Sequence, residues 1–150
     1  MYTHLLLPTD GSPLSNLALE QGLALAAALG ARVTILTVVE PFYVFSASPG
    51  HLGEGREQYE RYAKQAAQDI LKHARQKAEA QGVSAQVKVL GGEHPDQAII
   101  DTAAELGCDL IAMASHGRRG VNALLLGSVT QKVLTWSKVP VLVLRQPGGA

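Results

Sequence analysis

Cysteine and net charge are both scarce in this sequence. Cys108 is the single cysteine among 150 residues, so the chain can form neither an intrachain disulfide nor a zinc site with several cysteine ligands. A chain without disulfides is typical of a reducing compartment. The 13 Lys and Arg residues balance the 13 Asp and Glu residues, which argues against a broad basic surface for nucleic acid and against an acidic tail.

Long hydrophobic runs are also missing. The segment before Leu5 has no cluster of positive charge, and the apolar run that follows ends at Pro8, so no signal peptide is expected. The longest apolar stretch, near residues 23–29, is too short to cross a bilayer. We therefore expect a soluble cytoplasmic protein that binds neither nucleic acid nor membranes.

Several motifs for catalysis and metal binding are absent from the sequence. There is no G-x-x-x-x-G-K-[ST] P-loop, no G-x-G-x-x-G dinucleotide motif and no G-x-S-x-G nucleophile elbow. His4, His51, His73 and His94 have no neighbour at a metal-ligand spacing, so we expect no metal held by protein side chains. The sequence also shows no obvious pair of nucleophile and base.

What the sequence does contain is a regular alternation of two patterns. Apolar residues make up 47% of the chain, enough for a core, and the 15 glycines suit an α/β fold with tight turns. Short apolar or β-branched runs indicate strands at residues 5–7, 33–39, 83–90, 109–114 and 139–144. Apolar residues at helical spacing indicate helices over residues 13–29, 59–81, 95–106 and 128–137.

The expected helix ends carry residues that favour them. Ser12 and Pro13 predict the N-cap and first residue of one helix, and Gly30 and Gly107 predict the ends of two. The stretch from Pro41 to Gly55 contains helix breakers and is expected to be a loop. One stripe of the long helix is expected to face the core: Tyr59, Tyr62, Ala63, Ala66, Ala67, Ile70, Leu71, Ala74 and Ala78.

This alternation predicts one α/β domain over residues 1–150, with a doubly wound, five-stranded parallel sheet and helices on both faces. Such sheets bind ligands beyond the carboxyl ends of the strands, where the winding direction reverses. If strands one to three and strands four and five wind in opposite directions, the reversal lies between strands one and four. The loops Pro8 to Gly11 and Ala114 to Gly117 then meet there.

The segment from Ala114 to Ser128 carries the strongest binding signal. Gly127 and Ser128 open a helix, so free backbone N–H groups, a hydroxyl and the positive end of the helix dipole form a natural phosphate site. Arg118 and Arg119 add positive charge to this segment. The alternative is that Ser128 caps its helix and the glycines only form turns.

Two side chains in these loops are candidates for ligand contacts. Asp10 follows the first strand, where a carboxylate can accept hydrogen bonds from ribose hydroxyls. An N-cap or Asx-turn is the alternative role for Asp10. His116 is the one histidine in a candidate loop. The alternative to a ligand contact is that His116 is an ordinary hydrogen-bonding or surface residue. Cys108 precedes a buried strand and is expected to be a small core residue.

Three blocks of the chain together resemble the universal stress protein family. The first strand and its loop, Leu5 to Ser12, look like the opening motif of that family. The second strand ends in Leu36-Thr37-Val38-Val39, at the family's adenine-contacting position. Met113-Ala114-Ser115-His116-Gly117, nine residues and Gly127-Ser128-Val129 are similar to the signature G-x2-G-x9-G-[ST].

The resemblance covers essentially the whole chain and implies a five-stranded fold of the adenine-nucleotide α-hydrolase type, with strand order 3-2-1-4-5. It also implies binding of ATP, with Mg²⁺ carried on the nucleotide phosphates. The residues carried over to the adenosine side are Asp10 and Val38, with Pro8, Thr9 and Met113 lining the cleft. Those near the phosphates are Gly117, Gly127, Ser128 and Val129, and the neighbouring Ala114, His116 and Arg118 complete the expected site.

One residue departs from the signature, and one strand suggests a partner. Ala114 stands at the first glycine of the signature, where an added methyl is tolerated if φ is negative and crowds the ligand otherwise. The family also commonly dimerises through its last strand. Val139 to Leu144 fits an apolar sheet edge that a second copy would cover, with Pro140 restricting the register.

Three functions follow from these observations. The first is an ATP-binding stress-response protein that acts as a regulator or ligand-dependent switch. The second is a nucleotide-independent, dimeric interaction module of the same fold, for which Ala114 is the support. The third is an enzyme, at most a slow ATPase or a nucleotide-dependent transferase, with Asp10 or His116 as the acid or base.

The balanced net charge conceals an asymmetry along the chain. Residues 1–110 hold 8 Lys or Arg and all 13 Asp and Glu residues, a net charge of −5. Residues 111–150 hold 5 basic residues and no acidic one, a net charge of +5. The expected phosphate loop lies in this positive part, which suits an anionic ligand.

Overall fold

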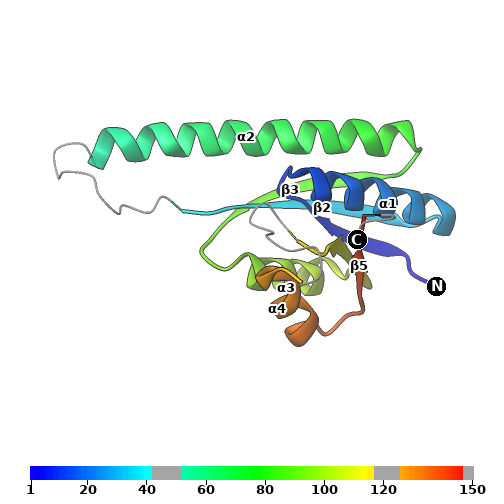
Figure 1. The fold of residues 1–150 in the computed structure, drawn as a ribbon. Helices are drawn as coiled ribbons and strands as arrows, with labels where there is room; N and C mark the ends of the chain where they lie inside the picture. Colours follow the sequence, from blue (N-terminus) through cyan, green and yellow to red (C-terminus); the bar gives the residue numbers. More distant parts are fainter. Residues whose placement is uncertain (42–51, 117–125, 147–150) are drawn as a thin grey trace.

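The computed structural model describes residues 1–41, 52–116 and 126–146, with side chains from residue 55 onward in the second helix. Strands and helices alternate along the chain as predicted (Figure 1). In chain order they are β1 (His4–Pro8), α1 (Pro13–Leu29), β2 (Arg32–Val39), α2 (Leu52–Ala80), β3 (Ala85–Gly91), α3 (Pro95–Leu106), β4 (Leu110–Ala114), α4 (Ser128–Trp136) and β5 (Val141–Leu144).

The strands form one parallel sheet in the order β3-β2-β1-β4-β5, which confirms the predicted fold class and strand order. β1 is central, because Leu5 pairs with Val33 of β2 on one side and with Leu110 of β4 on the other. α1 and α2 cover one face of the sheet, and α3 and α4 cover the other (Figure 1). The chain therefore winds toward β3 first and toward β5 afterwards, and the reversal lies between β1 and β4.

The three leucines of β1 supply both halves of the core. Leu5 and Leu7 point into the cluster under α1 and α2, whereas Leu6 points into the cluster under α3 and α4. Each is at most 1% exposed. Full burial of one such side chain contributes about 1.5–3 kcal/mol. The continuous apolar run in the sequence is therefore the consequence of a strand buried on both faces.

The predicted helix ends are confirmed. The Ser12 hydroxyl accepts a hydrogen bond from Ser15 N–H at 3.3 Å, and Pro13 is the first residue of α1. α1 and α3 end at Gly30 (φ 67°) and Gly107 (φ 69°), in the left-handed region that favours glycine.

Several element boundaries differ from those expected. The expected loop Pro41 to Gly55 is wrong at its end, because α2 begins at Leu52; residues 42–51 lie outside the described part of the chain. Glycines are tolerated in a first turn, whose N–H groups need no partner within the helix. β5 begins at Val141 rather than Val139, because the Ser137 hydroxyl engages both backbone groups of Val139. Pro140 then has no N–H to donate to the sheet. β3 and β4 likewise begin later than expected, at Ala85 and Leu110.

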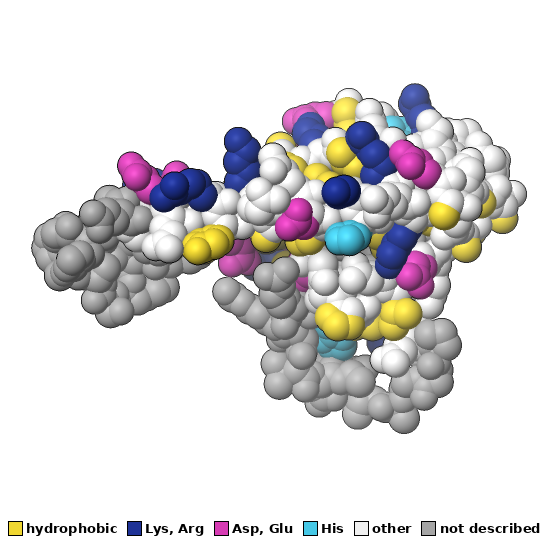
Figure 2. Space-filling view, turned by 90° about the horizontal axis from the view of Figure 1, so that it is seen from above, with side chains coloured by type: hydrophobic (Ala, Val, Ile, Leu, Met, Phe, Trp, Pro, Cys, Tyr) yellow, Lys and Arg dark blue, Asp and Glu magenta, His cyan; other side chains and the backbone are white. Residues whose placement is uncertain are grey.

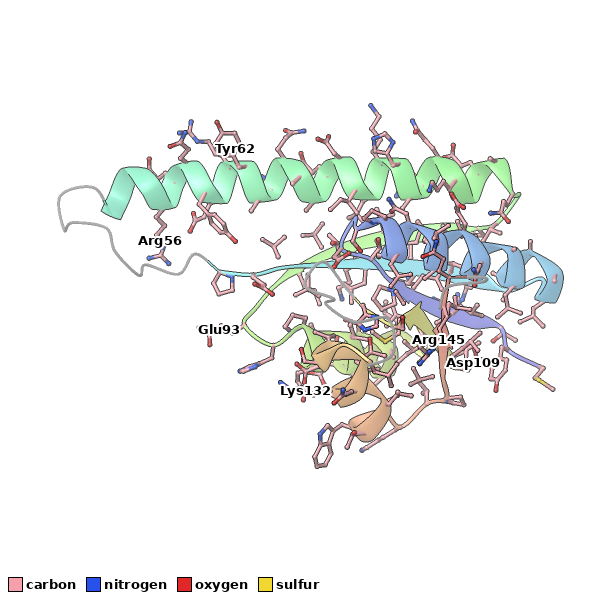
Figure 3. The ribbon with its side chains drawn as sticks, in the orientation of Figure 1. Arg56, Tyr62, Glu93, Asp109, Lys132 and Arg145 are labelled. Carbon is pink, nitrogen blue, oxygen red and sulfur yellow. The ribbon has the colours of Figure 1, made fainter. Side chains whose placement is uncertain are left out.

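α2 extends beyond the sheet that it covers (Figure 1). Its buried side chains begin at Ala67 and continue through Leu71, Ala74 and Ala78, which confirms the inner part of the predicted stripe. From residue 55 to residue 66 no side chain is buried. Tyr62, predicted on the stripe, is 68% exposed and points away from the sheet (Figure 3).

Ala66, also predicted on the stripe of α2, is exposed as well, because the outer half of the helix has no core beneath it. Charged side chains of both signs lie along the face that α2 covers (Figure 2). Arg56 and Glu60 of α2 form an exposed ion pair at 3.2 Å. Such pairs contribute little to stability, so the inner half of α2 anchors the helix.

Cys108 is buried, and burial raises the pKa of its thiol to about 11. It is therefore the small core residue that the sequence predicts. In the ranges that the structure covers, no helix has the combined length and apolar character of a membrane span.

A buried polar chain crosses the sheet near the amino ends of its strands. His4 is 3% exposed, and its Nε2 atom lies 2.7 Å from the Thr34 hydroxyl, which also accepts a hydrogen bond from Gln86 Nε2 at 2.8 Å. Burial lowers the pKa of His4, and the Arg32 guanidinium adds to this effect, which outweighs the opposing influence of Asp109. His4 is therefore neutral in the folded protein near neutral pH.

This lowered pKa predicts a loss of stability in mild acid. The unfolded chain binds a proton at His4 below about pH 6.5, whereas the folded protein resists protonation. The stabilising contribution of His4 is thus complete above that pH and declines as the pH falls through the folded-state pKa. Urea unfolding from pH 7.5 to about pH 5 should show this decline, and His4→Gln should flatten it. His73→Gln, at an exposed position on α2, should leave it unchanged. Equal slopes for wild type and His4→Gln would refute this assignment.

Candidate functional site

The carboxyl ends of β1 and β4 lie side by side at the centre of the sheet. The two strands are hydrogen-bonded neighbours, and the chain winds away from them in opposite directions. Parallel sheets of this type hold ligands in the crevice that forms at this point. The loops that begin there start at Thr9 and Ser115, as the sequence predicts.

The loop after β1 is fixed by hydrogen bonds to Thr9, which is 6% exposed. Its N–H donates to Leu36 O at 2.9 Å, and its carbonyl accepts from the Thr37 hydroxyl at 2.7 Å. Its hydroxyl accepts from the Ser15 hydroxyl at 2.7 Å. Thr9 is therefore part of the framework, and the next residue, Asp10, is attached to a backbone that is held in place.

Asp10 lies in the Asx-turn that was the alternative to a ribose contact. Its Oδ1 atom accepts the N–H of Ser12 at 2.9 Å, and its own N–H donates to the Ser15 hydroxyl at 3.1 Å. Gly11 takes a positive φ of 79°, which completes the turn. The turn positions the half-buried carboxylate directly after the carboxyl end of β1, so the structural role and a binding role are compatible at Asp10.

The end of β4 is joined to the start of α4. The Thr130 hydroxyl donates to Ala114 O at 2.9 Å, and Gly127 N–H donates to Ser115 O at 2.8 Å. Ser115 N–H donates to Leu144 O at 3.3 Å, which ties the same peptide to the neighbouring strand. The first turn of α4 is thereby held against the carboxyl end of β4.

The N-cap residue of α4, Gly127, has no side chain that could cap the helix. Gly127 is the N-cap residue and Ser128 is the first residue of the helix, so the alternative in which Ser128 caps the helix is wrong. The first N–H groups of a helix have no partner within it, and they lie at the positive end of its dipole. The first turn carries no acidic residue. The arrangement suits an anion.

His116 is buried rather than on the surface, at 8% exposure. Its Nδ1 atom lies 3.2 Å from the Ser115 hydroxyl, which is itself 5% exposed. Its Nε2 atom is buried and has no hydrogen-bond partner among the residues that the structure describes. A buried polar atom without a partner is rare, so this nitrogen needs an explanation.

Met113, Val38 and Ala114 are further predicted site residues that the structure describes. Met113, at 6% exposure, and the half-buried Val38 pack in or against the core under α3 and α4. Ala114 is 8% exposed, and no described residue other than glycine has a positive φ. The methyl of Ala114 therefore causes no backbone strain.

Pro8 ends β1 and is half-buried, while Val129 packs against the core under α3 and α4. Gly117 and Arg118 lie outside the described ranges, as do Arg119 and Gly120.

Four residues that sequence reasoning missed hold the site in place: Ser15, Thr37, Ser115 and Thr130. The available signal was a hydroxyl residue one or two positions from a strand end, or within the first turn of a following helix.

In the described ranges, no group of three His, Cys, Asp or Glu side chains is placed to hold a metal ion.

Basic residues lie on α4 and in the segments that flank it. Figure 3 shows Lys132 on α4 and Arg145 directly after β5. Among residues 126–146, which the structure describes without a gap, Lys and Arg are present and Asp and Glu are absent. The neighbouring helix α3, which packs against α4, carries Asp96, Asp101 and Glu105, so both signs of charge are present on this side of the sheet.

The bond from Thr130 to Ala114 predicts a measurable loss of stability when it is removed. Thr130→Val keeps the shape of the side chain but leaves the buried carbonyl without this donor, which should cost about 1–2 kcal/mol. Thr135→Val is the matched control, because its hydroxyl donates to Gln131 O in the same helix at an exposed position. Its cost should stay within about 0.5 kcal/mol. Chemical denaturation measures both, and equal costs would contradict the role of Thr130.

Known proteins resemble this chain over nearly its whole length. The sequence matches the model of the universal stress protein family over residues 1–145. It is 33% identical to universal stress protein MJ0531 of Methanocaldococcus jannaschii over 150 residues, covering 98% of this chain and 84% of that protein. It is 34% identical to universal stress protein YxiE of Bacillus subtilis over 153 residues, covering 97% of this chain and all of that protein.

Two solved structures share the fold over nearly the full length. MJ0577 of Methanocaldococcus jannaschii superposes with a TM-score of 0.81 at 27% identity, covering 99% of both chains. A universal stress protein solved in complex with cAMP superposes with a TM-score of 0.67 at 27% identity, covering 96% of this chain and 97% of that one. From the family match, the sequence identity and the shared fold, this chain belongs to the universal stress protein family.

Proposed function

We propose that this protein binds an adenine nucleotide, ATP in particular, between the loops that follow β1 and β4. Binding would make it a ligand-dependent regulator in the stress response of a reducing, cytoplasmic compartment. The observation that carries the proposal is the amino end of α4, which begins at a glycine N-cap and is held at the carboxyl end of β4 by Gly127 and Thr130. This is the arrangement to which phosphate groups bind in α/β proteins.

Each part of the nucleotide has a partner in this arrangement. The amides of Ser128 and Val129 and the small Gly127 suit the phosphates, and the Asp10 carboxylate suits the ribose hydroxyls. Pro8, Thr9, Val38 and Met113 would border the adenosine. Gly117 would also lie near the phosphates, and Ala114, His116 and Arg118 would complete the site. Mg²⁺ would arrive on the phosphates and neutralise part of their charge.

A relative supports the ligand class. The universal stress protein solved with cAMP shares 27% identity with this chain and the same fold. Adenosine and phosphate are the chemical groups that cAMP and ATP have in common. The preference for ATP rests on the residues of this chain, because several uncapped amides and nearby basic side chains favour more than one phosphate.

The other two functions have less support. The hypothesis of a nucleotide-independent interaction module was supported by Ala114. The backbone at Ala114 accommodates the methyl without strain, which weakens that support. Fast catalysis would need a free base, whereas Asp10 is engaged by Ser12 N–H and His116 is buried. We therefore infer binding with at most slow hydrolysis of ATP.

Nucleotide binding should depend on the absence of a side chain at Gly127. A ligand that binds only the folded protein stabilises it, by about 2.7 kcal/mol at 100 times its Kd. Mg-ATP should therefore raise the Tm of the wild type, and Gly127→Leu should abolish this rise because the side chain blocks the approach of phosphates. Gly92→Leu is the control, since open space surrounds that position. If millimolar Mg-ATP leaves the wild-type Tm unchanged and calorimetry detects no heat of binding, the proposal fails.

We also propose a homodimer in which the open edge of β5 pairs with β5 of a second copy. β5 lies at one edge of the sheet, is apolar along its length and exposes 37% of Leu142. An uncovered apolar edge promotes association, and two-fold pairing is the simplest arrangement that removes it.

A charge on β5 should therefore dissociate the protein. Leu142→Lys should shift the sedimentation coefficient from that of a dimer to that of a monomer, because two like charges would oppose each other near the two-fold axis. Val89→Lys is the matched control on β3, the opposite edge strand, where Val89 is 44% exposed. A wild type that sediments as a monomer, or a dimer broken only by Val89→Lys, would overturn this assignment.

A further inference from the structure

The outer surface of α3 and α4 carries charges of opposite sign on two adjacent helices. Asp101 and Glu105 lie on α3, Lys132 lies on α4 and Lys138 follows that helix, and all four residues are exposed. We propose that this face binds a second copy of the chain, with α3 of each copy lying against α4 of the other. The inference is independent of the nucleotide site and of the contact through β5.

The last turn of α4 exposes a large aromatic side chain. Trp136 is the single tryptophan of the sequence and is 69% exposed, and Leu134 is 41% exposed. Among the described residues seven large hydrophobic side chains are exposed, and this helix of nine residues carries two of them. Tryptophan is enriched among the residues that dominate the binding energy of protein interfaces, so its exposure here indicates a protein partner.

Each helix presents one charged stripe to the solvent. Asp101 and Glu105 are four residues apart on α3, so they share one face of that helix. Lys132 and Trp136 are spaced in the same way on α4. In the described ranges, neither Asp101 nor Lys132 forms an ion pair within one copy, whereas Glu105 has an exposed ion pair with Lys88 at 3.9 Å. Asp101 and Lys132 are therefore the charges that are left for a partner.

The two stripes run side by side in the same direction. α3 connects β3 to β4, and α4 connects β4 to β5. Because all the strands are parallel, both helices return antiparallel to the sheet and are parallel to each other. They pack against each other on one face of the sheet (Figure 1).

Charge selects how two such surfaces fit together. A two-fold axis perpendicular to the helices would place α3 against α3, with like charges opposed. An axis parallel to the helices places α3 of one copy against α4 of the other in two equivalent contacts, so that each acidic stripe meets a basic one. The second arrangement is the one that the charges favour.

The positions of the residues along the two helices match in this arrangement. Asp101 lies five residues before the end of α3, and Lys132 lies four residues before the end of α4, so they meet at similar heights. Ala104 is exposed and small, two residues before the end of α3, and the ring of Trp136 at the end of α4 can lie on it.

The association should be weak, because the helices are only about 18 and 14 Å long and the face they form is small. The test therefore uses the Leu142→Lys background, in which the contact through β5 is opposed by charge. Trp136 reports on this face directly, because no other tryptophan contributes to the emission. Its emission should shift to shorter wavelength as the concentration rises from about 1 µM to about 1 mM, in step with sedimentation as a dimer.

Exchange of the two charges tests which helices face each other. Asp101→Lys and Lys132→Glu should each weaken the association about tenfold, because each opposes like charges in both contacts. An equimolar mixture of the two variants should recover it. In the mixed dimer the introduced lysine meets the introduced glutamate, and the native Asp101 of one copy meets the native Lys132 of the other.

The contribution of the aromatic ring has a matched control. Trp136→Ser should weaken the association at least tenfold, as measured by sedimentation. Tyr62→Ser, at an equally exposed aromatic position on α2, should leave it unchanged.

Three outcomes would overturn the inference. Emission of Trp136 that stays the same at all concentrations shows that this face binds no second copy, and leaves an unlike partner as its occupant. A mixture that associates no better than the separate variants refutes the pairing of α3 with α4. Stronger association of Asp101→Lys with the unsubstituted protein than with Lys132→Glu shows that α3 lies against α3. None of these results affects nucleotide binding, which is measured separately by calorimetry.

Discussion

The candidate site depends on one strand that is hydrogen-bonded at both edges and buried on both faces. β1 pairs with β2 and β4, and its leucines supply the core on either side of the sheet. Any shift of β1 by one residue would exchange the side chains of the two faces, so its register is strongly determined. The positions of Thr9 and Asp10 are fixed as a result. Ser115, directly after β4, is fixed in turn, because β4 pairs with β1.

Hydroxyl side chains convert this rigid sheet into a rigid binding edge. Thr37 and Ser15 hold the loop after β1, and the Thr130 hydroxyl together with the Ser115 carbonyl holds the first turn of α4 at the end of β4. Each of these four residues is buried, and three of the four bonds are made by a hydroxyl side chain. Hydrogen bonds in such surroundings are strong and costly to break. The described residues of the candidate site are therefore held by hydrogen bonds of the protein itself.

The fold was largely predictable from the sequence, because buried strands and capped helices leave direct marks. Leu5 to Leu7, the Ser12-Pro13 pair and Gly30 each take the structure expected of them. The misplaced features have a shared cause. Periodicity shows which side of α2 would face a core, but not where the core ends, so Tyr62 was assigned to a buried stripe. Ser128 and His116 were ambiguous for a similar reason, since capping and burial depend on segments that meet only in the folded chain.

The length of α2 has a consequence for how stability is distributed in the molecule. Its 29 residues span about 43 Å, and the first buried side chain is Ala67. A free helix as short as the outer half is marginal in water, so this half stays helical because it continues a helix already anchored to the sheet. The Tyr59 hydroxyl, which donates to Glu40 O at 2.8 Å, ties it to the chain after β2. The outer half can thus unwind at a small free-energy cost while β1, β4 and the crevice between them remain intact, which makes it an independent low-stability unit beside a rigid site.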